Sequence, residues 1–134
     1  MFKAVAIIAI IWNVFGVMSY LMHQFMTPET IAALPQNQQD FMNNIPSWRM
    51  LAFAIATFGG LFASVLLLVK KKKSMVFFAL SLLGIIIGNI YDVFIVDYYK
   101  DAGISGLVLP LLIFFLGVFF LSYSKKVDKL GLLK

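Results

Sequence analysis

The chain has 134 residues, of which 62% are hydrophobic and 13% are charged, and it contains no cysteine. A soluble domain of this length needs more polar residues to cover its surface, so the composition indicates a protein whose solvent is lipid. The net charge of +5 comes from residues at the ends of apolar runs rather than from one basic face, which argues against nucleic-acid binding.

Four uncharged or nearly uncharged runs are long enough to cross a bilayer as α-helices, which takes about 20 residues each. They cover residues 4–22, 50–69, 75–96 and 102–123. The runs are too long for the strands of a membrane barrel, and they lack alternation. No small-residue cleavage motif follows the first run, so we expect it to be retained as a helix. The sequence therefore predicts an all-α, four-helix transmembrane bundle that forms one domain over residues 1–134.

Basic residues are distributed unevenly between the two sides of these spans. One side carries nine lysines, namely Lys3, Lys70, Lys71, Lys72, Lys73, Lys125, Lys126, Lys129 and Lys134. The other side carries only Arg49 and Lys100. Because positive residues stay in the cytoplasm, we expect both termini and the lysine turn to be cytoplasmic. Residues 23–48 and the short loop 97–101 would then lie outside.

The outer segment, residues 23–48, has the signals of two short helices. Thr27, Pro28 and Glu29 read as an N-cap, a first-turn proline and an acidic first turn. Pro35 ends this helix, and a second helical stretch follows over 36–44. We favour an amphipathic connector that lies on the lipid headgroups. The alternative is a lid over the outer mouth of the bundle.

Small residues form stripes on the second and third spans. On the second span they are Ala52, Ala56, Gly59 and Ala63, with Gly60 beside them, and on the third they include Gly84 and Gly88. Small residues let membrane helices approach closely. We expect the two stripes to pack against each other within the chain, although a GxxxG pair could also form a homodimer seam.

Few polar side chains lie inside the spans. Asn13 and Asn89 are at similar depth, and an amide in hydrocarbon needs a hydrogen-bond partner. They either bond to each other as helix glue, which we prefer, or belong to a polar ring around a substrate. Asp92 is the one acid inside a span, with Arg49 and His23 as its expected partners. It forms either a structural ion pair, which its shallow depth favours, or a titrating pair in a working site.

The motifs Trp12-Asn13-x-x-Gly16, Met26-Thr27-Pro28-Glu29, Pro46-x-Trp48 and Gly59-Gly60 give the chain a family resemblance. It resembles small bacterial four-span proteins that are usually labelled hypothetical membrane proteins or "sugar transporter". The resemblance implies the same topology in the bacterial cytoplasmic membrane. It assigns no role to any individual residue.

Two functions are compatible with these features. The first is a small, oligomeric, transporter-like protein for a small solute, with the speculative substrate-binding residues Asn13, His23, Arg49, Asn89 and Asp92. The second is an accessory or structural subunit of a larger membrane complex, without transport or catalysis of its own. We do not expect an enzyme, because no nucleophile–base pair is readable. The lone histidine and the absence of cysteine predict no metal site, and we expect no cofactor.

Overall fold

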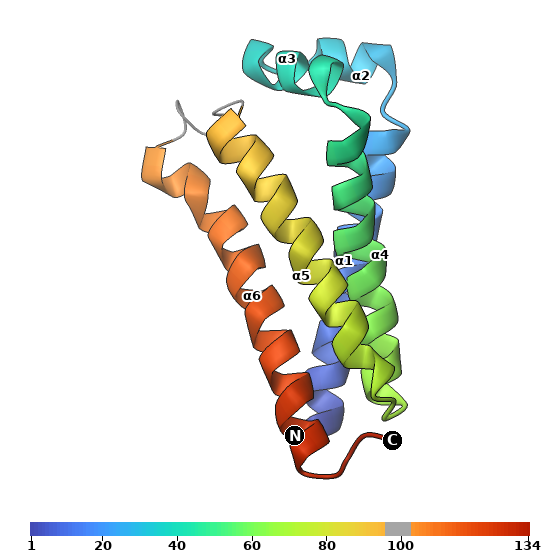
Figure 1. Ribbon diagram of the computed structural model, residues 1–134. Coiled ribbons are helices and arrows are strands. Elements are labelled where there is room, and N and C mark those ends of the chain that lie inside the picture. Colours follow the sequence, from blue (N-terminus) through green and yellow to red (C-terminus); the bar gives the residue numbers. More distant parts are fainter. Residues whose placement is uncertain (96–102) are drawn as a thin grey trace.

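The computed structural model describes residues 1–95 and 103–134, and in these ranges every regular element is a helix (Figure 1). In chain order the elements are α1 (Phe2–Gln24), α2 (Pro28–Ala32), α3 (Gln36–Asn44), α4 (Ser47–Leu68), α5 (Lys73–Ile90), the π-helix η1 (Tyr91–Ile95) and α6 (Gly103–Lys129). The prediction of an all-α four-helix bundle is confirmed. The expected loop at 97–101 lies outside the described residues.

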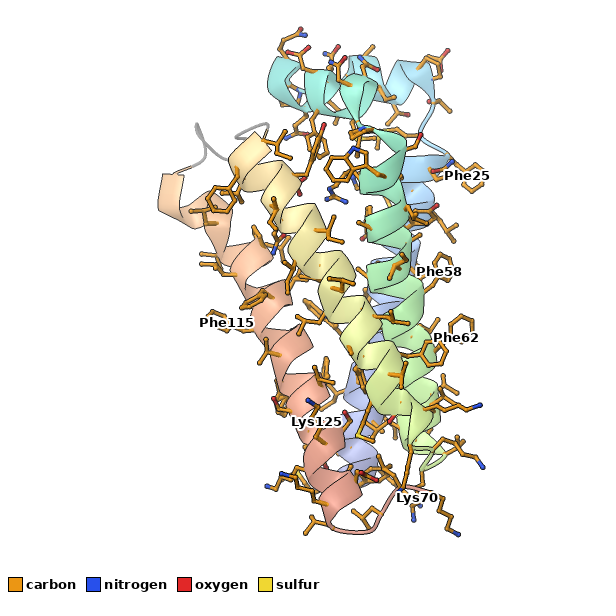
Figure 2. The ribbon with its side chains drawn as sticks, in the orientation of Figure 1. Phe25, Phe58, Phe62, Lys70, Phe115 and Lys125 are labelled. Atoms are coloured by element: carbon orange, nitrogen blue, oxygen red, sulfur yellow. The ribbon has the colours of Figure 1, made fainter. Side chains whose placement is uncertain are left out.

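Four helices are long and apolar enough to cross a membrane: α1, α4, α5 with η1, and α6. Large apolar side chains point outward from them, including Phe62 on α4 and Phe115 on α6 (Figure 2). The helix ends differ from the expected spans by a few residues, and two of the differences stand out. α4 begins at Ser47, directly after Pro46, and α6 continues past Tyr123 as far as Lys129.

Neighbouring helices pack in the order α1 on α4, α4 on α5 and α5 on α6. The α1–α4 pair and the α5–α6 pair are inclined to each other and lie closest where the two chain ends lie (Figure 1). We call this the lysine-rich end, because it carries Lys70–Lys73, Lys125 and Lys126. A buried apolar cluster fills it, and its members include Ala6, Ala63, Leu67, Phe78, Phe120 and Leu133. Helices α2 and α3 cross the opposite end (Figure 1).

Helices α4 and α5 approach each other closely at Gly84. A Cβ atom at this position would lie 2.6 Å from the Ala52 carbonyl oxygen and 2.9 Å from the Ala56 nitrogen. Ser81 reinforces the contact by donating a hydrogen bond of 2.6 Å to the Ala56 carbonyl. Gly59 has more room, since its Cβ would lie 3.6 Å from the Phe77 carbonyl oxygen. The structure therefore uses these small residues inside one chain, and Gly84 is buried from any second copy.

The short helices of the segment between α1 and α4 form as local sequence signals require. The Thr27 hydroxyl accepts a hydrogen bond from the Thr30 nitrogen, and Pro28 occupies the first turn of α2. Pro35 stands at the N-cap of α3. The Gln39 side chain donates to the carbonyls of Ala32 and Leu34 and so ties α3 to α2.

Candidate binding cavity

A cavity of about 600 Å³ lies in the half of the bundle that is farther from the lysine-rich end. This volume is within the range of small-molecule sites, which is roughly 300–1,000 Å³. The wall contains all of the polar residues that the sequence singled out, namely Asn13, His23, Arg49, Asn89 and Asp92. Four different helical segments supply them, so the fold gathers at one place side chains that are far apart in the sequence.

The strongest polar interaction in the cavity wall joins Arg49, on the first turn of α4, to Asp92 in η1. The guanidinium Nε donates to Oδ1 and Nη2 donates to Oδ2, each at 2.9 Å. The two side chains are only 13% and 8% exposed. This bidentate geometry is the strong form of an arginine–carboxylate pair. Arg49 is thus the partner of Asp92. It is one of the two partners expected from the sequence, the other being His23.

The surroundings of Arg49 hold its guanidinium in place. Its Cζ atom lies 5.5 Å from the centre of the Phe53 ring, which is a cation–π distance. On another side it packs on Gly88, where an added Cβ would be 3.3 Å from Cζ. Gly88 therefore makes room for the guanidinium. Within residues 1–95 and 103–134, Nη1 has no hydrogen-bond partner, so it is available to the cavity.

His23 does not pair with Asp92, which corrects the second expected partnership. Its Nδ1 lies 2.8 Å from the carbonyl oxygen of Ser19, one turn earlier on α1. A carbonyl can only accept, so we place the ring proton on Nδ1, which leaves Nε2 of the neutral ring as an acceptor. The ring meets Phe53 edge-on, with the ring centres 5.5 Å apart. Phe53 therefore contacts both His23 and Arg49.

Asn13 bonds to α4, not to Asn89, so the expected pairing of the two amides is wrong. Its Nδ2 donates to the carbonyl of Ala9 at 2.8 Å and to the hydroxyl of Ser64 at 3.1 Å. Ser64 in turn donates to the Gly60 carbonyl at 2.7 Å. The periodicity of α1 placed Asn13 on a packed face but could not tell which neighbouring helix it faces.

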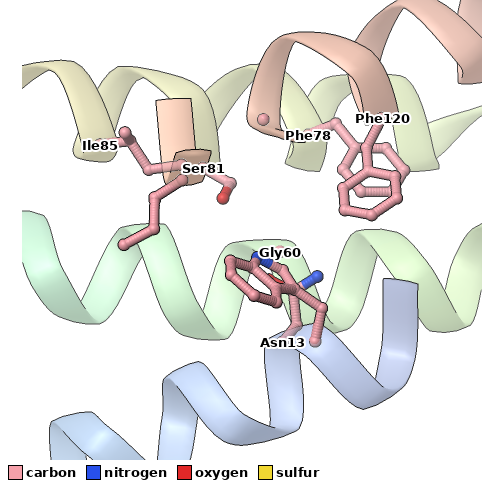
Figure 3. Close-up of a pocket in the computed structure, with 9 residues that line it drawn as sticks. Asn13, Gly60, Phe78, Ser81, Ile85 and Phe120 are labelled. Carbon is pink, nitrogen blue, oxygen red and sulfur yellow. The ribbon is translucent and has the colours of Figure 1, made fainter. Parts of the chain in front are cut away.

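A second, smaller cavity of about 20 Å³ adjoins Asn13 (Figure 3). It is lined also by Gly60, Ser81 and Phe120, and it shares Asn13 and other wall residues with the larger cavity. Its volume is sufficient for one water molecule, and the amide and hydroxyl in its wall supply polar partners. The polar part of the large cavity thus extends toward the middle of the bundle.

Asn89 is a polar residue of the cavity wall whose hydrogen bonding the described residues leave incomplete. Its side chain lines the large cavity. In the described part of the chain it has no hydrogen-bond partner. An amide at this depth in a membrane protein needs a hydrogen-bond partner, because burying it without one costs about 2–7 kcal/mol. Water or a ligand in the cavity could supply this partner.

The segment between α1 and α4 covers the cavity. Leu34, Gln38, Phe41 and Met42 all contribute to its wall. The connector interpretation would instead place the apolar members of this set on lipid headgroups. The Phe41 ring packs on Tyr91 with the centres 6.0 Å apart, which fixes α3 above η1. The segment is amphipathic, but its apolar side faces the cavity, as the lid interpretation requires.

Two parts of this site could not be recognised from the sequence. The π-helical turn carries Asp92, and such turns are frequent at functional sites. The wall supplied by α6, which includes Leu109, Pro110 and Ile113, was also missed. Pro110 was the available signal, because a proline inside an otherwise regular span is tolerated mainly where neighbouring groups or a cavity accommodate it.

Helices that could span a membrane, with large apolar side chains on their outer surfaces, define a multi-pass membrane protein. Its particular feature is a partly polar cavity lined by residues of a single chain. No protein-family model, curated protein or solved structure matches the sequence or the fold.

Proposed function

We propose that the chain is a small transporter-like protein of the bacterial cytoplasmic membrane that binds a small solute in the 600 Å³ cavity. One observation carries the proposal: the five polar residues that the sequence singled out, from four helical segments, all line one cavity. Polar groups inside membranes are costly and mark solute paths by default. The resemblance to proteins labelled "sugar transporter" agrees with this role.

The orientation that we propose follows from the lysines. With the lysine-rich end and both chain ends in the cytoplasm, the cavity lies in the outer half of the membrane under the segment that carries α2 and α3. One chain encloses the site, so an oligomer is not needed to form it. The proposal includes no catalytic step.

Transport would require the closed end of the bundle to open while the end that holds the cavity closes. The lysine-rich end is closed by its apolar cluster, whereas the opposite end holds the cavity. α4 and α5 are in close contact at Gly84, between these two ends. Rocking of the α1–α4 pair against the α5–α6 pair about this contact would open the lysine-rich end as the cavity closes.

A second candidate function, an accessory or structural subunit, is favoured by a different observation. The two strongest polar pairs, Arg49 with Asp92 and Asn13 with Ser64, are satisfied within the chain. In an accessory subunit these bonds would only hold helices together. The cavity would then never connect to the cytoplasmic side.

A chain without cysteine allows a direct test, because a single cysteine can report access. Asn89→Cys places a thiol in the cavity, and Leu83→Cys, on the same helix but 53% exposed, faces outward into lipid. Both would be treated with a small membrane-impermeant thiosulfonate in right-side-out and in inside-out vesicles. A transporter predicts labelling of Asn89→Cys from both faces and of Leu83→Cys from neither. If Asn89→Cys is labelled from one face only, or from none, the accessory function replaces the transporter.

A further inference from the structure

One side of the cavity borders on the surroundings of the bundle. Close packing joins α1 to α4, α4 to α5 and α5 to α6, but within the described residues no comparable packing joins α6 back to α1. At this seam the wall is made by Phe15 of α1 and Leu109 of α6, which are 62% and 59% exposed. Residues in the middle of α1 lie at the depth of the hydrocarbon. The cavity therefore adjoins lipid at the α1–α6 seam.

At the end of the bundle that carries α2 and α3, apolar side chains cover the way into the cavity. Leu34, Phe41 and Met42 of the connecting segment form this part of the wall, with Gln38 as its polar member. A water-soluble solute would have to displace these side chains. A molecule that is dissolved in the bilayer could instead reach the cavity between α1 and α6.

The charges of the wall limit the charge of the occupant. Among the described residues that line the cavity, Arg49 and Asp92 are the charged ones, and they neutralise each other through two hydrogen bonds. Among these residues an ionic ligand would find no free counter-charge, and a buried charge without a partner is strongly disfavoured. The occupant is therefore expected to be uncharged.

Polar groups that remain available in the wall define the head of the ligand. Nη1 of Arg49 can donate, Nε2 of His23 can accept, and the amide of Asn89 can do both. A hydroxyl or carbonyl group satisfies such a set, since it offers acceptor and donor atoms without charge. The rest of the wall, including Trp12, Phe15, Leu109 and Ile113, is apolar and suits a hydrocarbon or ring body.

We propose that the ligand is an uncharged amphiphile from the bilayer, which enters between α1 and α6 and places a hydroxyl- or carbonyl-bearing head against Arg49 and Asn89. Its apolar body lies along Trp12 and Leu109. This proposal rests on the proposed function, in that the cavity is taken to be the binding site, and it adds the chemical class and the route of the solute.

The two tryptophans allow this to be measured in the intact protein. Trp12 lines the cavity, whereas Trp48 lies outside it against Tyr91. In a Trp48→Phe variant in lipid nanodiscs, Trp12 would be the only tryptophan, and brominated chains would quench it on contact. Three probes with the same ω-brominated chain would be compared: a monoacylglycerol, the free fatty acid at a pH where it is ionised, and an alkylammonium.

We expect saturable quenching by the monoacylglycerol, at a concentration at least about tenfold lower than for either ion, because only the ions must be buried without a counter-charge. Asn89→Leu should weaken monoacylglycerol quenching, because it removes a hydrogen-bonding partner of the head group, whereas Leu83→Ala, outward-facing on the same helix, should leave it unchanged. Quenching that rises linearly and equally for all probes, or saturable binding that favours an ion, overturns the proposal.

Thiol labelling of Asn89→Cys distinguishes an error in the proposed ligand class from an error in the proposed transporter function. Access to Asn89→Cys from both faces without saturable amphiphile binding would leave a transporter whose solute comes from water. Saturable monoacylglycerol binding without access from both faces would leave the ligand class correct and the transport function wrong.

Discussion

Arg49 and Asp92 face each other through two hydrogen bonds of equal length, 2.9 Å, at the point where α4 and the end of α5 separate. The pair has two consequences. It joins the two inclined halves of the bundle on the cavity side, and it neutralises the two charged side chains found among the described residues of the cavity wall. Because both side chains are nearly buried, neither can lose its partner without leaving an uncompensated charge.

We therefore expect Asp92→Asn and Arg49→Gln each to lower the free energy of unfolding by about 3–5 kcal/mol, since each leaves one buried charge alone. The double variant should be less destabilised than the sum of the singles, because it leaves no lone charge. Denaturation in mixed micelles of the two single variants and the double variant measures this coupling. Strictly additive effects would show that the pair is solvated and contributes little.

Gly84 and Gly59 provide a matched pair on the two faces of the α4–α5 contact. Gly84→Ala puts a methyl group 2.6 Å from the Ala52 carbonyl, so it should cost about 1–3 kcal/mol through overpacking. At Gly59 the same methyl group has ordinary contacts of 3.6 Å. Gly59→Ala should thus be neutral or stabilising by up to about 1 kcal/mol, because alanine is the better helix former. Equal melting temperatures for the two variants would contradict this contact.

The hydrogen bond between Asn13 and Ser64 should appear as a coupling energy. We expect a cycle of Asn13→Ala with Ser64→Ala to give about 0.6–1.7 kcal/mol, the range for such bonds between membrane helices. The corresponding cycle of Asn13→Ala with Asn89→Ala should give none, because Asn13 bonds to Ser64 and not to Asn89. Coupling to Asn89 in place of Ser64 would restore the pairing that the sequence suggested.

The orientation in the membrane can be tested by reporter fusions. A fusion after Lys134, or one inserted at Lys72, should be fluorescent as a green fluorescent protein and inactive as alkaline phosphatase, because both positions are expected in the cytoplasm. A fusion at Asp40 should give the opposite result. An active phosphatase at Lys134 together with an inactive one at Asp40 would invert the protein and place the cavity in the cytoplasmic half.

The features that could be predicted are those set by length, composition or local signals. The spans follow from apolar runs, and α2 follows from the cap at Thr27 and the proline at position 28. The Arg49–Asp92 pair was foreseeable because few charged groups exist at a shared depth. Small residues likewise mark a face that can approach another helix, and Gly84 does so.

Other features depend on contacts that periodicity does not specify. A helical face does not say which of several neighbours it meets, which is why Ser64 was not identified as the partner of Asn13. The cavity depends on the inclination of the helix pairs, a property of the whole bundle. The role of the connecting segment was equally open, since an apolar face suits a lipid surface and a cavity alike until Phe41 is placed on Tyr91.

The π-helical turn at Tyr91–Ile95 has an implication for how related sequences should be aligned. An i→i+5 turn holds one residue more than the α-helical turn it replaces, so it corresponds to a single inserted position. An ungapped alignment through this stretch would then assign the wrong residue to the position opposite Arg49. A one-residue gap between 91 and 95 would therefore mark a relative in which the acid is supplied differently, or is lost.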